Sequence, residues 1–229
     1  PPRSTLFPYT TLFRSPKAMG LGGSSALAVA IIRAIDHHFG TKLSDKKINE
    51  LAYECEKAAH GTPSGVDNTV ATFGSPLFYK NNKGQPMFEE INLGQPIELV
   101  VGITGMESLT AETVTKVRQA WTQSPERYES LFNQIEQLTL SGLDCLKTGK
   151  VEELGELMNI CHGYLNALQL STPELEELVH IARSHGALGA KLTGGGGGGS
   201  MIALCQDNKD AIEAAMNKAG YKTLPYSIS

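Results

Sequence analysis

Few cysteines, little net charge and no long apolar run characterise this sequence, and each absence argues against a class of protein. None of the four cysteines among the 229 residues stands in a CxxC or Cys/His ligand pattern, so we expect reduced thiols in a cytoplasmic protein, without a disulfide frame or zinc site. The sequence contains no run of about 18 apolar residues, so no transmembrane helix is predicted. A net charge of −4 gives no bulk attraction to nucleic acid or an anionic membrane. The cysteines are Cys55, Cys145, Cys161 and Cys205.

Residues 1–15 stand apart from the rest of the sequence. Residues 3–7 and 11–15 nearly mirror each other around residues 8–10, with neither a helix period nor strand alternation. No charged region followed by a long apolar stretch marks a signal peptide. We interpret the segment as translated cloning or adapter sequence, with a disordered natural tail as the alternative, and leave it out of the fold prediction.

From Pro16 onward, the 41% of hydrophobic residues is enough to bury the core of one or two domains. Apolar spacing predicts a helix over residues 26–39, capped by Ser24 and Ser25, and a second over residues 45–59 with Ser44 as its N-cap. Residues 60–68 are interpreted as a loop, and residues 75–97 as short strand-like runs separated by turns.

The apolar run over residues 98–104 predicts a buried strand, and we place a domain boundary near it. The expected domains are an N-terminal domain of residues 16–95 and a C-terminal domain of residues 96–229. The second half is rich in predicted helices, and strands and helices mix without strict β–α–β repetition, so the expected fold class is α+β. The helices are predicted over residues 110–121, 125–147, 151–169, 173–186 and 208–219, and the strands over residues 200–205 and 221–228.

The first candidate site is a glycine-rich loop that leads into the first helix. Its glycines permit a tight turn, and the helix behind it directs unpaired N–H groups and its positive dipole end at the loop, an arrangement that binds phosphate. No lysine follows the glycines as in a Walker loop, and the spacing does not fit a dinucleotide fingerprint. A plain glycine turn with a serine cap is the alternative. The residues are Gly20, Leu21, Gly22, Gly23, Ser24, Ser25 and Ala26.

The second candidate is the loop of residues 60–68, in which Pro63 and Gly65 impose a shape and Asp67 lies at the end. A carboxylate held there would accept a proton from a substrate hydroxyl or stabilise a metal-bound state. The alternative is that Asp67 caps the next segment and that His60 merely ends a helix.

The third candidate is the run of six glycines over residues 194–199. Consecutive glycines are costly to order, so a compact protein keeps them where backbone passes very close to something else. A flexible linker is the alternative, and the strand-like residues 187–190 and 201–204 on both sides argue against it.

These three motifs, in this order, resemble those of the GHMP kinase family, which comprises galactokinases, homoserine kinases, mevalonate kinases and phosphomevalonate kinases. Residues 16–26 (PKAMGLGGSSA) are similar to the family's phosphate-binding motif P-x-x-x-G-L-x-S-S-A. Residues 191–200 (KLTGGGGGGS) are similar to its motif K-L-T-G-A-G-G-G-G, with Gly195 where alanine is frequent. HGTPSGVDN, at residues 60–68, resembles the form used by the mevalonate kinase branch.

The resemblance implies ATP and Mg²⁺ as cofactors and mevalonate as substrate. The glycine loop would wrap the ATP phosphates, and Ser25 would hold Mg²⁺ together with Glu56, eleven residues before Asp67. Asp67 would orient or deprotonate the C5 hydroxyl of mevalonate during in-line transfer of the γ-phosphoryl group, giving 5-phosphomevalonate for isoprenoid precursor synthesis. The implied substrate-binding residues are His60, Ser64, Thr110, Gly194, Gly195, Gly196 and Gly197.

The resemblance also implies two α+β domains, the first like ribosomal protein S5 domain 2 and the second ferredoxin-like, with the ligands between them, and it is compatible with a homodimer. Family members carry an N-terminal lysine near the transferred phosphoryl group, and N-terminal strands that line the mevalonate and adenine sites. Lys17 lies immediately before the phosphate loop, the wrong place for that lysine. We therefore expect the natural N-terminus to be missing and this chain to be weakly active or inactive.

Other members of the superfamily and a non-catalytic role are the alternatives. Phosphomevalonate kinase and mevalonate diphosphate decarboxylase share the fold and the ATP site. A phosphorylated substrate would need added Arg or Lys near its pocket, and residues 60–75 and 104–113 contain no such cluster. A degenerate relative acting as a ligand sensor or dimer partner comes from a different class, and the intact Ser25, Glu56 and Asp67 argue against it.

Overall fold

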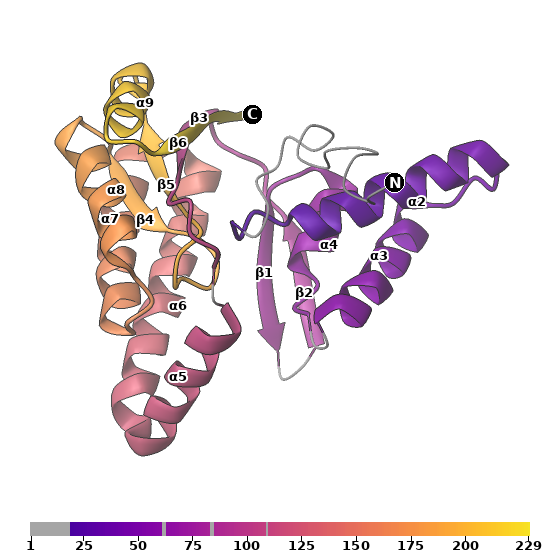
Figure 1. Ribbon diagram of the computed structural model, residues 1–229, viewed down its shortest axis with the longest axis horizontal. Helices are drawn as coiled ribbons and strands as arrows, with labels where there is room; N and C mark the ends of the chain where they lie inside the picture. Colours follow the sequence, from indigo (N-terminus) through magenta and orange to yellow (C-terminus); the bar gives the residue numbers. More distant parts are fainter. Residues whose placement is uncertain (1–18, 61–62, 83–84, 109) are drawn as a thin grey trace, which may run out of the picture.

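A computed structural model describes residues 19–60, 63–82, 85–108 and 110–229 of the chain (Figure 1). Residues 1–15, interpreted above as foreign sequence, lie outside the described residues. The chain mixes helices with antiparallel sheets, so the predicted α+β class is confirmed. Among the described residues, no helix combines the length and the apolar character that crossing a membrane requires.

The first part of the chain places three helices beside a β-hairpin (Figure 1). Val29 of the first helix packs with Ile48 and Ala52 of the second, and these residues are almost fully buried. The hairpin strands pair antiparallel, from Leu77 opposite Glu90 onward. The elements are α2 (Gly23–Phe39), α3 (Asp45–His60), α4 (Val66–Phe73), β1 (Leu77–Asn82) and β2 (Gln85–Glu90).

The predicted cap of α3 is confirmed, and the predicted caps of α2 are wrong. Ser44 Oγ accepts a hydrogen bond from the Lys47 backbone N–H at 3.3 Å, which is the N-cap interaction expected of a serine. In α2 the cap position is Gly22, which has a left-handed backbone (φ 65°). Because glycine adopts that conformation without strain, the helix begins earlier than predicted, and the serines lie inside its first turn.

Helix α4 begins inside the segment that the sequence predicted as a loop. Gly65, with φ 82°, occupies its cap position and turns the chain sharply, so that Asp67 lies in the first helical turn. A carboxylate is favoured there because it faces the positive end of the helix dipole. Eight residues are too few for helical periodicity to be visible in the sequence.

The second part of the chain is a four-stranded antiparallel sheet in the order β4-β5-β3-β6, with helices packed on it (Figure 1). The predicted buried strand is confirmed as β3 at the centre of this sheet. The elements are β3 (Ile97–Ile103), α5 (Thr110–Gln123), α6 (Pro125–Thr148), α7 (Val151–Ala167), α8 (Pro173–Ser184), β4 (Gly189–Leu192), β5 (Ser200–Cys205), α9 (Lys209–Lys218) and β6 (Lys222–Ile228).

Helices cover both faces of the sheet at β5, where neighbouring residues belong to different core clusters. Met201 packs with residues of α8 and α9 such as Leu178 and Met216. Leu204 faces the other way and packs with Met158 of α7. The sheet is therefore held firmly on both sides, and the turn between β4 and β5, which contains the six glycines, starts and ends on a rigid frame.

Candidate active site

The glycine loop ends at the N-terminus of α2, as its sequence predicted. Gly20 and Gly22 have left-handed backbones, with φ angles of 68° and 65°. Ser25, in the first turn, is fully buried, and its Oγ has no hydrogen-bond partner among the described residues. A buried, unpartnered hydroxyl beside the N–H groups of a helix N-terminus suits an anion such as phosphate.

The hydroxyl that reaches Glu56 belongs to Ser24, whereas the motif resemblance implied Ser25. Ser24 Oγ donates to Glu56 Oε1 at 2.6 Å and joins the start of α2 to α3, and Glu56 is only 6% exposed. This chain has Gly22 and Gly23 between Leu21 and the serine pair, where the family motif has a single residue. Counted from Leu21, Ser24 takes the place of the motif's second serine, and the buried Ser25 takes the place of its alanine.

Asp67 faces the glycine loop from α4. A Cβ atom added at Gly22 would lie 3.4 Å from Asp67 Cγ and 3.5 Å from Asp67 Oδ1. The first turn of α4 is tied to α3, because the Asn68 side-chain amide donates to Asn49 Oδ1 at 2.6 Å. Asn49 and Asn68 are positioning residues that the sequence prediction missed, and the only available signal was the asparagine that follows Asp67.

The donors at this site fit a magnesium ion. Mg²⁺ in kinase sites is held by one or two carboxylates together with substrate phosphates and water, so it needs no protein cage. Glu56 supplies a nearly buried carboxylate with the Ser24 hydroxyl beside it, and Asp67 lies across the loop. The described residues hold no group of three or more His, Cys, Asp or Glu side chains that would bind a metal without phosphate.

The six glycines pass close to other backbone, as predicted, and the linker alternative is wrong. Ser200 Oγ donates to the Met19 carbonyl at 3.0 Å, and an added Cβ at Gly199 would lie 3.1 Å from that same oxygen. An added Cβ at Gly196 would collide with the Leu170 carbonyl. Five of these glycines have positive φ, namely Gly194, Gly196, Gly197, Gly198 and Gly199.

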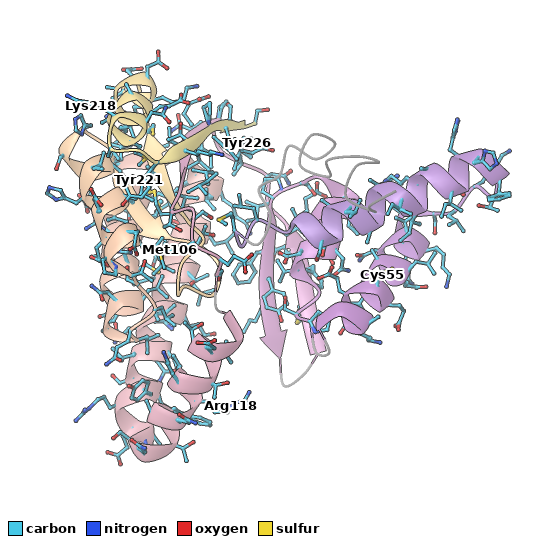
Figure 2. The ribbon with its side chains drawn as sticks, viewed as in Figure 1. Cys55, Met106, Arg118, Lys218, Tyr221 and Tyr226 are labelled. Atoms are coloured by element: carbon cyan, nitrogen blue, oxygen red, sulfur yellow. The ribbon has the colours of Figure 1, made fainter. Side chains whose placement is uncertain are left out.

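Three hydroxyls that follow β3 hold the glycine segment. Thr104 Oγ1 donates to the Gly199 carbonyl at 2.8 Å, Ser108 Oγ to Gly196 at 2.9 Å and Thr113 Oγ1 to Gly195 at 3.0 Å. The Gly199 N–H donates in turn to the carbonyl of Met106, which is labelled in Figure 2.

The sequence prediction selected Thr110 from this region and missed those three hydroxyls. Hydroxyl residues clustered just after a buried strand were the signal that would have found them. The side chains of Thr110 and His60 lie outside the described residues. Ser64 Oγ accepts from the Val66 N–H at 3.3 Å, so in this structure it shapes the turn into α4.

Two parts of the sequence match one protein family. Residues 10–75 match the GHMP kinases N terminal domain, and residues 143–222 match the GHMP kinases C terminal. The mevalonate kinase of Pyrococcus horikoshii is 41% identical over 212 residues, which cover 90% of this chain and 61% of that protein. The chain therefore spans less than two thirds of this curated relative.

Solved structures agree with the sequence matches. L. major mevalonate kinase in complex with R-mevalonate has a TM-score of 0.87 at 34% identity, covering 91% of this chain and 65% of that one. Mevalonate kinase from methicillin-resistant Staphylococcus aureus has a TM-score of 0.70 at 31% identity, covering 93% and 68%.

Proposed function

The chain belongs to the GHMP kinase family, and we propose that it serves ATP-dependent transfer of a phosphoryl group to the C5 hydroxyl of mevalonate. One observation carries the proposal: the Asp67 carboxyl group lies against Gly22 of the glycine loop, at the end of α2 where Ser24 meets Glu56. In the proposed reaction, Asp67 is the carboxylate on the acceptor side, and the glycine loop beside it binds the ATP phosphates.

Each side chain has a role that follows from its position. The loop N–H groups and the start of α2 would bind the ATP phosphates. Glu56 and Ser24 would hold Mg²⁺, which supplies positive charge against the phosphate oxygens. Asp67 would accept a hydrogen bond from the mevalonate hydroxyl, orient it and take its proton as the phosphoryl group is transferred. Residues Gly194 to Gly197 would form the wall between the phosphates and mevalonate, together with Ser64, His60 and Thr110 on the substrate side.

The two family matches fall on separate parts of the chain. We propose domains of residues 16–95 and 96–229, which the match of separate family profiles to the two halves supports. We also propose a cytoplasmic enzyme that binds neither nucleic acid nor membrane, which the net charge of −4 and the four free cysteines support. The family resemblance is compatible with a homodimer.

The proposed reaction is tested by ADP release with MgATP and a panel of acceptors. We expect release with mevalonate to exceed release with 5-phosphomevalonate, galactose or homoserine, measured at high protein concentration so that slow turnover is detected. Equal release with every acceptor, or a preference for a phosphorylated one, would contradict the assignment of mevalonate. The absence of MgATP binding by calorimetry would contradict the kinase assignment itself.

The two serines should separate metal binding from phosphate binding. Ser24→Ala removes the hydroxyl that contacts Glu56, so we expect the Kd for MgATP to rise about tenfold, with little change in the Kd for ATP in EDTA. Ser25→Ala removes the buried hydroxyl at the helix N-terminus, so we expect both dissociation constants to rise together. The assignment of Ser24 to the metal fails if the magnesium dependence is lost with Ser25→Ala and kept with Ser24→Ala.

A further inference from the structure

The open edge of β4 is covered by side chains of two helices. β4 lies at the edge of the four-stranded sheet, so one row of its backbone groups has no strand partner among the described residues. Asn159 of α7 bonds this row twice: its side-chain N–H donates to the Leu188 carbonyl at 3.1 Å, and its Oδ1 accepts from the Ala190 N–H at 3.0 Å. Arg183 of α8 donates to the Ala190 carbonyl at 2.8 Å.

The last backbone groups in this row belong to Leu192, and both are paired. The Leu192 N–H donates to His162 Nδ1 at 3.3 Å, and its carbonyl accepts from Lys191 Nζ at 2.8 Å. His162 is 3% exposed and Leu192 is fully buried. The row is thus sealed from Leu188 to Leu192 with no water needed, and its final bond comes two residues before Gly194.

The bond to Leu192 defines the protonation state of the imidazole. A backbone N–H is always a donor, so Nδ1 must be an acceptor and carry no proton. The single ring proton is then on Nε2, which lies 3.0 Å from Glu176 Oε1 and donates to it. His162 is therefore neutral, with one ring nitrogen on β4 and the other on α8.

The chain that follows β4 lies next to the phosphate loop. After Leu192, the Thr193 N–H bonds the Ser200 carbonyl, and the chain enters the glycine segment. An added Cβ at Gly194 would lie 3.6 Å from the Gly20 carbonyl, so this glycine is in van der Waals reach of the loop. Displacing Leu192 would carry Gly194 with it and change the gap between the segment and the loop.

We propose that His162, as a neutral imidazole protonated at Nε2, is a positioning residue for the nucleotide site, because it holds the end of β4 and thereby sets where the glycine segment meets the phosphate loop. The inference rests on the proposed function for its ligand, and its structural part stands on the hydrogen bonds alone.

Acid should release this contact. Burial lowers the pKa of His162 below 6.5, Glu176 on α8 opposes that shift, and Arg183 on α8 and Lys191 on β4 add to it. A depressed pKa means that the stability supplied by neutral His162 is complete above pH 6.5 and is lost as the pH falls through the lowered value. Protonated Nδ1 would place a second N–H against that of Leu192.

Two variants separate the two sides of the ring. In His162→Asn, the amide oxygen can stand where Nδ1 stands and accept from Leu192, while the donor to Glu176 is lost. In His162→Gln, the longer amide can reach Glu176, while the acceptor for Leu192 is lost. In His162→Gln, we expect the hydrogen-exchange rate of the Leu192 amide and the Kd for MgATP both to rise about tenfold over the parent protein. In His162→Asn, both should stay within about threefold of the parent values.

The outcomes distinguish this proposal from the proposed function. Equal behaviour of the two variants, or a nitrogen-15 spectrum showing the ring proton on Nδ1 at pH 7.5, would overturn the positioning role. If the unmodified chain does not bind MgATP, the proposed function fails, and the exchange of the Leu192 amide still decides whether His162 holds β4. Should His162→Gln not fold, the unmodified chain supplies the test. As the pH is lowered from 6.5, protection of the Leu192 amide from exchange must fall more than protection of the Ala203 amide in β5.

Discussion

Asp67→Asn is expected to lower phosphoryl transfer to mevalonate about 10²–10⁴-fold, the range over which a positioned general base contributes to rate. The carboxyl group faces Gly22 across the phosphate loop, and the amide keeps its shape and its place in the first turn of α4 while losing the capacity to take a proton. Because the proposed function assigns Asp67 to the acceptor side, the Kd for MgATP should remain within about threefold of the parent value.

Asp45→Asn is the matched control for this variant. Asp45 is also an acidic residue in the first turn of a helix, and it pairs with Arg33 at 2.9 Å on the surface, with both side chains about half exposed. Exposed pairs of this kind contribute about 0–1 kcal/mol to stability, so its turnover should match the parent. Asp67 would be removed from the chemistry if Asp45→Asn releases ADP above background and Asp67→Asn turns over within tenfold of it under the same conditions.

Local signals predicted most of the elements, because they depend on neighbours in sequence. Ser44 caps α3, and Thr172 accepts from the Leu175 N–H ahead of Pro173, as those residue types predict. The failures involve glycine. Gly22 and Gly65 adopt left-handed backbones that start α2 and α4 where side-chain patterns show nothing.

The candidate site was predictable as three motifs and not as an arrangement. The residue types in each motif indicated its chemistry. The approach of Asp67 to Gly22, however, depends on how α4 packs against α3, which no local pattern encodes. The hydrogen bond between Ser24 and Glu56 could not be predicted either, since the motif resemblance alone favoured Ser25. The hydrogen bonds from Asn159 and His162 to β4 could not be predicted from the sequence, because a polar residue on a helix usually faces solvent.

Gly155→Ala is expected to destabilise the protein by about 3 kcal/mol, near the upper end of the cost of overpacking a core. An added Cβ at Gly155 of α7 would lie 2.6 Å from the Leu188 carbonyl carbon and 2.7 Å from its oxygen, just before β4. These are backbone atoms and cannot rotate away. From the opposite side, a Cβ at Gly189 would collide with the Gly155 carbonyl. The melting temperature should fall by about 6–12 °C for a chain of this size.

Gly163→Ala provides the control on the same helix, because an added Cβ there meets nothing within 4 Å. Alanine is favoured over glycine inside a helix by about 0.8–1 kcal/mol, so this variant should melt higher than the parent by calorimetry. The opposite signs isolate the contact between α7 and β4, since both changes add one methyl group to one helix. That contact also carries Asn159 and His162 to the edge of β4, so Gly155→Ala should loosen the Leu192 amide even while the rest of the protein stays folded. A melting temperature for Gly155→Ala at or above that of the parent would show that α7 and β4 separate at little cost, and the edge of β4 would then not be rigid enough to position the glycine segment.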